Sequence, residues 1–183
     1  MRKLLLGFLF FLSFSAKSQE TEFSFNDNGM TDFIITSVEA KPAFEIYKKV
    51  IEWINVTYKN PNKVVLSTIE NQFVRFEGSS SEFYAMNAIS KIYVPVKYEI
   101  EISIKDGKYK FDYIGMTIIE NNIRIPYFNT KTKEELGKYP IFKNDGTLKS
   151  SYKYFTEVPI FLNNLNKSLL ESLISNVKKG NDW

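Results

Sequence analysis

Glu99 and Glu101 are the acidic side chains whose spacing comes closest to that of a catalytic pair. Two carboxylates can hydrolyse a glycosidic bond when they lie a few ångströms apart across a cleft. Residues two positions apart on a strand point to the same face of a sheet, so these two could act together. We favour a simpler interpretation, in which both belong to a solvated strand face and Lys97 and Lys110 neutralise them.

The sequence contains no histidine and no cysteine, which removes most other catalytic chemistry. Ser-His-Asp and Cys-His catalysis, histidine and thiolate metal sites, and disulfides all require one of these residues. Nucleophile-elbow, P-loop and dinucleotide-binding motifs are absent as well. The segment 144–146 (Asn-Asp-Gly) lacks the ligand series of a calcium loop, so we interpret it as a turn. The sequence therefore predicts neither a cofactor nor a metal.

Arg75 and Arg124 each lie among residues that favour strands. Arginine suits the bidentate binding of an anion. The alternative, which we favour, is an outward strand position with the aliphatic stem lying on a neighbour. The partner-binding candidates from the sequence are therefore six charged residues: Glu99, Glu101, Lys97, Lys110, Arg75 and Arg124.

A β-hairpin is the clearest structural signal in the chain, and it would position these charges. Aromatic and aliphatic residues alternate with polar ones on both sides of Asp106-Gly107, a pair typical of type I′ turns. A two-residue loop pairs Lys105 with Lys108 and Ile104 with Tyr109. One face then carries Tyr98, Ile100, Ile102, Ile104, Tyr109, Phe111 and Tyr113, and the other carries Lys97, Glu99, Glu101, Lys110 and Asp112.

The remaining pattern predicts further strands and two helices. Strands are expected at 32–38, from Val64, at 72–77 and, after a break at 78–81, briefly at 83–84. A helix begins near Pro42, with an apolar stripe formed by Phe44, Tyr47, Ile51, Ile54 and Tyr58. Trp53 neighbours that stripe, so we expect it to pack in the core or at its rim. The second helix begins at Thr156 as N-cap and continues with Val158, Leu162, Leu165, Leu169, Leu173 and Val177.

Residues 121–155 form a long, polar stretch rich in tyrosine and phenylalanine. Such a loop in a compact domain is functional, partly structured or mobile. It could be a partner-binding or lid segment, or an arm whose aromatic residues attach it to the sheet. The sequence favours neither interpretation.

The order of elements predicts an α+β fold: a curved antiparallel sheet of about five strands with two helices on one face, in the order β-α-β4-α. Short turns between consecutive strands imply antiparallel pairing, and each helix has one apolar stripe to bury. The length of 183 residues suits one domain, which we place at 19–183 with 121–155 as a long loop or insertion.

The first 18 residues have the layout of a secretory signal peptide. Arg2 and Lys3 precede an apolar run, and the segment 16–18 (Ala-Lys-Ser) has the pattern that signal peptidase cleaves. We therefore expect an exported protein, periplasmic or secreted, with no transmembrane segment after cleavage. Without cysteine it would not be a lipoprotein. The segment holds three basic and no acidic residues, so the remainder of a chain with 24 basic and 21 acidic side chains is formally neutral. Global charge thus gives no argument for nucleic acid.

Two motifs resemble a family of bacterial proteins of unknown function. The run from Ile46-Tyr47 to Trp53-Ile54, followed by Tyr58 and the dipeptide 60–61 (Asn-Pro), resembles the Y-x-x-x-x-x-W-I helix of that family. The hairpin around Asp106-Gly107 resembles its V-K-D-G-K-Y segment, with Ile104 where valine is usual. The resemblance covers residues 28–120 and departs from the family at 79–90 and 121–155. It implies a TATA-binding-protein-like (TBP-like) fold and export by Gram-negative bacteria. It implies no activity, and a fold name by itself does not imply DNA binding.

Two functions fit these observations. The favoured one is a non-catalytic secreted or periplasmic module that binds an unidentified protein or ligand in the cell envelope. The alternative is a carboxylate-dependent hydrolase acting on envelope or extracellular glycans. We expect a binding surface to be wet and charged, on the sheet face that the helices leave open.

Overall fold

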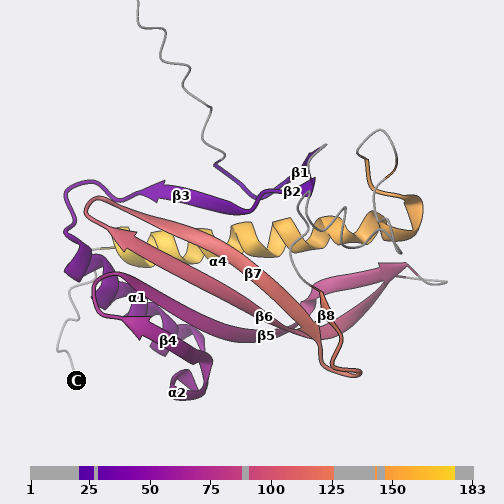
Figure 1. Ribbon diagram of the computed structural model, residues 1–183, viewed down its shortest axis with the longest axis horizontal. Helices are drawn as coiled ribbons and strands as arrows, with labels where there is room; N and C mark the ends of the chain where they lie inside the picture. Colours follow the sequence, from indigo (N-terminus) through magenta and orange to yellow (C-terminus); the bar gives the residue numbers. More distant parts are fainter. Residues whose placement is uncertain (1–20, 27–28, 88–90, 126–142, 144–146, 176–183) are drawn as a thin grey trace, which may run out of the picture.

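The computed structural model describes residues 21–26, 29–87, 91–125, 143 and 147–175 (Figure 1). The expected signal peptide and most of the aromatic stretch within 121–155 lie outside the described residues. The strands are β1 (Phe25–Asn26), β2 (Gly29–Met30), β3 (Phe33–Ser37), β4 (Val65–Ile69), β5 (Phe73–Asn87), β6 (Lys91–Lys105), β7 (Lys108–Ile118) and β8 (Arg124–Ile125). The helices are α1 (Ala43–Thr57), α2 (Pro61–Val64), the 3₁₀ helix η1 (Ser150–Thr156) and α4 (Glu157–Ile174).

One antiparallel sheet, in the order β3-β7-β6-β5-β4, organises the molecule. The two-residue strand β8 pairs with β7 beyond the point where β3 ends. Strands β1 and β2 form a separate small hairpin. The predicted α+β architecture of about five antiparallel strands is thus confirmed, with β4 at one edge of the sheet and β3 and β8 sharing the other.

Both helices lie on the same side of the sheet (Figure 1). Helix α1 contacts β5, β6 and β7, and α4 contacts β5 and α1. Side-chain hydrogen bonds join the helices: Trp53 Nε1 donates to Ser168 Oγ at 3.1 Å. Lys49 Nζ donates to the carbonyls of Ser172 at 3.4 Å and of Ser175, just past α4, at 3.1 Å. The sheet face beneath them carries the predicted apolar residues, all buried: Tyr98, Ile100, Ile102, Ile104, Tyr109, Phe111 and Tyr113. We call this the inner face and its opposite the outer face.

The central hairpin has the predicted register but a different turn. Lys105 pairs with Lys108 and Ile104 with Tyr109. Gly107 has a φ of +73°, whereas Asp106 is not among the residues with positive φ. A type I′ turn needs positive φ at both central residues, so that expectation is wrong. A tertiary contact accompanies this different turn: the Asp106 carboxylate accepts a hydrogen bond from the Ala43 amide of α1 at 2.7 Å.

Strand β5 is longer than predicted. The expected break at 78–81 does not occur. Residues 73–77 and 83–84 belong to one strand, with a register shift against β6 between Ser80 and Tyr84. Gly78 is an inner-face residue opposite Tyr98. A Cβ atom at Gly78 would lie 2.7 Å from Tyr98 Cε2 and closer still to the hydroxyl end of that ring. The glycine therefore makes room for a side chain and does not end the strand.

Helix α1 buries a face that only partly coincides with the predicted stripe, of which Ile54 is buried and Tyr58 packs against the core. Ile46, Val50, Trp53 and Ile54 are buried, which confirms the expectation for Trp53. Phe44, by contrast, is 61% exposed. Tyr47 and Ile51 are only partly buried. The first half of the stripe differs from the prediction because apolar residues occur on two neighbouring faces of α1, and spacing alone cannot say which one meets the sheet.

Thr156 does not cap α4 with its side chain. It has helical backbone angles and its hydroxyl donates to the Lys153 carbonyl at 3.1 Å, because η1 leads directly into α4. The stripe that begins at Val158 is buried as predicted up to Leu173, except for the partly buried Leu165. None of the helices within the described ranges combines the length and the hydropathy needed to cross a membrane.

Candidate functional site: the outer sheet face and the groove beside it

The six charged residues chosen from the sequence all lie on the outer face, spread over four strands. Arg75 is on β5, Lys97, Glu99 and Glu101 are on β6, Lys110 is on β7 and Arg124 is on β8. On β5, β6 and β7 their strand neighbours are buried on the inner face, so alternation places these residues outward. Arg124 shares the face through its pairing with Thr117, which stands opposite Lys97. Helices α1 and α4 lie on the opposite side of the sheet (Figure 1).

Arg75 joins the two glutamates. Its Nη2 and Nε donate to Glu101 Oε2 at 2.7 and 3.1 Å, and its Nε lies 3.8 Å from Glu99 Oε1. Arg124 Nη2 donates to the other oxygen of Glu99 at 3.0 Å. The result is a chain of alternating charge, Arg124–Glu99–Arg75–Glu101, which we call the arginine–glutamate ladder. Lys97 and Lys110 were expected to neutralise these acids, and that expectation is wrong.

The strand register explains why the arginines take this place. Arg75 is directly opposite Glu101, so the guanidinium and carboxylate meet across the ladder of β5 and β6. Arg124 must reach from β8 over β7 to β6. Gly115 of β7 lies opposite Glu99 at a β-bulge, and its missing side chain leaves that path open. Arginine is long enough, and its planar donors suit a carboxylate.

The two lysines have other partners, which the sequence search missed. Lys97 Nζ lies 3.0 Å from Glu77 Oε1, and Lys110 Nζ lies 2.7 Å from Asp112 Oδ2. Asp112 had been placed on this face by the hairpin register. Glu77 could have been found only from the pairing of β5 with β6, where it stands opposite Glu99.

Burial distinguishes the carboxylates from ordinary surface acids. The side chains of Glu99, Glu101 and Asp112 are 15, 19 and 16% exposed. Burial raises the pKa of Asp112, the hydrogen bond and charge of Lys110 lower it less, and the neighbouring charge of Glu101 adds to the rise. Among the residues that the structure describes, no group of three acidic side chains is arranged to hold a metal ion.

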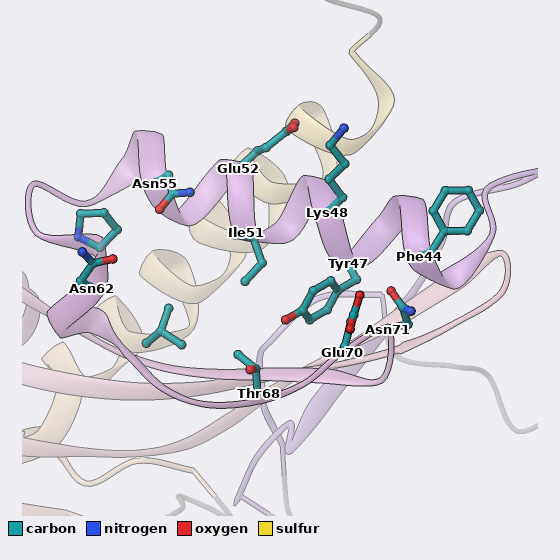
Figure 2. A pocket seen from close by; sticks show the side chains of 12 residues that line it. Phe44, Tyr47, Lys48, Ile51, Glu52, Asn55, Asn62, Thr68, Glu70 and Asn71 are labelled. Atoms are coloured by element: carbon teal, nitrogen blue, oxygen red, sulfur yellow. The ribbon is translucent and has the colours of Figure 1, made fainter.

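A groove of about 860 Å³ is a second candidate site, and it lies between α1 and the edge strand β4. Figure 2 shows Tyr47 and Ile51 pointing from the helix toward β4, and Thr68 pointing back from the strand. The helical wall consists of Phe44, Tyr47, Lys48, Ile51, Glu52 and Asn55. The opposite wall consists of Pro61, Asn62, Val65, Thr68, Glu70 and Asn71.

The groove exists because α1 stops short of the sheet edge. The helix packs over β5, β6 and β7, so that a groove separates it from β4. The sequence search did not propose this site. Its signal was the stripe of Phe44, Tyr47 and Ile51, which we had assigned to the core.

Comparison with known proteins identifies similar folds among solved structures but no related sequence family. No protein-family model matches the chain, and no curated protein matches it. Among solved structures, a DUF4468 family protein from Bacteroides ovatus aligns over 84% of this chain and 91% of its own, with 13% identity and a TM-score of 0.59. A TBP-like protein from Parabacteroides distasonis aligns over 77% of this chain and 90% of its own, with 13% identity and a TM-score of 0.50.

The fold is therefore TBP-like, as the resemblance to an uncharacterised family implied. At 13% identity the likeness extends to the arrangement of the sheet and helices and to nothing at the level of side chains. The site must be interpreted from this chain's own residues.

Proposed function

We propose that the protein is a non-catalytic binding module that presents its outer sheet face to a protein partner in the cell envelope. The observation that carries the proposal is the arginine–glutamate ladder. Three strands contribute its four charged side chains, which are ordered by one another, and α1 and α4 lie on the opposite side of the sheet (Figure 1). Side chains already held in ion pairs lose little conformational freedom on binding, so this face is preorganised for a polar interface.

The mixed charge favours a protein over a nucleic acid. Four carboxylates, Glu77, Glu99, Glu101 and Asp112, lie along the middle of the face. They would repel backbone phosphates, whose attraction dominates nucleic-acid binding. A protein surface with acidic and basic groups in a complementary pattern would instead exchange ion pairs with the ladder. Such an interface gives specificity and weakens with salt.

The layout of residues 1–18 supports the cell envelope as the compartment. The proposal rests on the basic start, apolar run and cleavage pattern of residues 1–18. Intact-mass measurement of the protein from an envelope fraction tests it, and the chain should begin at or near Gln19. Retention of Met1 in that fraction would refute cleavage.

A charge-exchange variant tests the binding face. In Arg75→Glu/Glu101→Arg the two charges trade strands, so the cross-strand pair can re-form while the pattern offered to a partner is reversed. Isolated ion pairs at a surface are worth about 0.2–1 kcal/mol, so folding should survive. Affinity purification of tagged wild type from the native envelope, at low and high salt, should recover a partner that the exchanged variant loses.

The matched control exchanges an ion pair elsewhere. Lys167→Glu/Glu171→Lys reverses an exposed pair on α4, on the other side of the molecule, and should leave recovery unchanged. If the first variant does not fold, Lys97→Glu/Glu77→Lys makes the same test on the outer face. A partner recovered equally by wild type and by a folded outer-face variant would refute this face as the site.

A carboxylate-dependent hydrolase is the second candidate, and one observation favours it. Asp112 stands opposite Glu101 across β6 and β7, and burial raises its pKa as a general acid requires. Glycan hydrolysis by this pair would fall as pH rises through the raised pKa of Asp112, and Asp112→Asn would abolish it. Absence of turnover on glycan substrates leaves the binding module as the function.

A further inference from the structure

We propose that the groove between α1 and β4 binds an extended segment of a partner polypeptide, which adds to the sheet as a further strand beside β4. The segment would carry apolar side chains at alternate positions and polar ones between them. This site is separate from the outer face, so neither proposal depends on the other.

The backbone of β4 is the first argument. The strand is the last of the sheet and pairs only with β5 among the described elements. Its other side therefore presents a row of backbone donors and acceptors to the groove. An extended polypeptide can satisfy such a row, whereas a compact ligand cannot.

The wall of α1 is the second argument. Phe44, Tyr47 and Ile51 are spaced by three and four residues, so they form a continuous stripe along the helix. On the strand side, the bulge between Val65 and Ser67 turns both Val65 and Thr68 toward the helix. Side chains that point inward from an added strand would lie against this stripe.

The helix wall and the β4 edge have matching lengths. From Phe44 to Asn55 the helix wall extends about 17 Å at 1.5 Å per residue. The five residues of β4 span about 17 Å at ~3.4 Å per residue. A segment of five or six residues therefore fits, with α2 at one end and the β4–β5 turn at the other (Figure 2).

The charges at the rim specify the polar positions. Lys48 and Glu52 lie on the helix side and Glu70 on the strand side, all exposed, and no ion pair to another described residue engages them. A partner segment that carries an acid near Lys48 and a base near Glu70 would complement the rim. The expected occupant is thus an alternating apolar and charged strand with both signs of charge.

Selection from a random heptapeptide display library on the full chain tests the proposal. The selected peptides should alternate apolar and polar residues and lack proline at central positions. Methylating single backbone amides of a selected peptide should weaken binding at least tenfold at alternate positions, because only every second amide faces β4. Equal tolerance at every position would overturn strand addition.

Matched variants of α1 locate the site. Phe44→Glu and Val56→Glu each place a charge at an exposed position of the same helix, but only Phe44 lines the groove. Phe44→Glu should weaken the selected peptide at least tenfold, and Val56→Glu should not. Ile51→Glu is a second groove variant whose folding is checked by circular dichroism.

Two outcomes would contradict the proposal. If the selected peptides bound Phe44→Glu and Val56→Glu equally well, their binding site would lie outside the groove. A concentration-dependent dimer that Phe44→Glu dissociates would identify a second copy of this chain as the occupant in place of a partner. A monomer whose peptide binding is lost in Phe44→Glu and unaffected by the outer-face exchange confirms the groove as a separate site.

Discussion

At the scale of single residues, Gly78 and Tyr98 show how one contact determines what a local pattern means. Tyr98 crosses over β5 at Gly78, and its hydroxyl lies 2.9 Å from that of Tyr58 at the end of α1. Phe83 and Phe161 flank the ring, with centroids 5.3 and 5.2 Å away. The ring is therefore held on all sides, and a methyl group at Gly78 has no free space.

We expect Gly78→Ala to lower the free energy of unfolding by roughly 1–3 kcal/mol, the usual cost of overpacking a core. Urea denaturation with and without Tyr98→Ala measures it as a double-mutant cycle. In the Tyr98→Ala background the glycine substitution should cost nothing, since the ring it strikes is gone. An equal cost in both backgrounds would refute the contact.

For the charged residues, the sequence predicted the sheet face correctly but not the ion-pair partners. Alternation identified which side chains point outward, because the period of a strand is two. It could not identify the counterions of Glu99 and Glu101, because these depend on the register of β5 and β8 against β6 and β7. Arg75 had been interpreted as an outward strand residue whose aliphatic stem lies on a neighbour, and the sequence did not indicate that its guanidinium joins both acids.

At the scale of elements, the turn between β6 and β7 fastens α1 to the sheet. Asp106 accepts from the first amide of α1 at 2.7 Å, Gly107 donates to the Lys41 carbonyl at 2.8 Å, and Val38 donates to the Gly107 carbonyl at 2.8 Å. Pro42 precedes the helix and cannot cap it with a side chain. The cap thus comes from 63 residues away.

Asp106→Ala should destabilise the protein by about 1 kcal/mol, because it removes an N-terminal cap and a favourable charge at the helix dipole. Asp106→Asn keeps an acceptor and should cost less. Lys108→Ala, an exposed neighbour in the same hairpin, serves as control. Guanidinium denaturation curves compare the three, and an Asp106→Ala midpoint equal to that of wild type would contradict the role of the cap.

At the scale of the whole molecule, the sheet has one dry and one wet face. The inner face and both helices enclose the core, and several tyrosines complete it. Burial raises the pKa of Tyr109 to about 12, and burial also raises the pKa of Tyr58 and Tyr98. In the unfolded chain these phenols have the usual tyrosine pKa of about 10.

Stability should therefore fall as pH rises above about 10, because the unfolded state then releases protons that the folded state retains. Each such tyrosine contributes a slope of roughly 1.4 kcal/mol per pH unit until its folded-state pKa is reached, which for Tyr109 is about 12. Ultraviolet titration of the phenolates, followed together with circular dichroism, should show these groups ionising only as the fold is lost. Tyr58→Phe should make the loss less steep. Full ionisation of the tyrosines in a folded protein would contradict the prediction.

The sequence by itself determined the class of fold, the central hairpin and the charged character of one sheet face. Each of these follows from local periodicity: alternation in strands, spacing of three and four in helices, and a two-residue turn. Three features were decided by the tertiary structure. The register of β5 and β8 chose the partners in the ladder. The path of Tyr98 turned an apparent strand break into a continuous strand. The position of α1 over β5, β6 and β7, away from β4, moved Phe44, Tyr47 and Ile51 from the expected core to the wall of a groove. In each case the deciding neighbour lies far away in the chain, where no local pattern reaches.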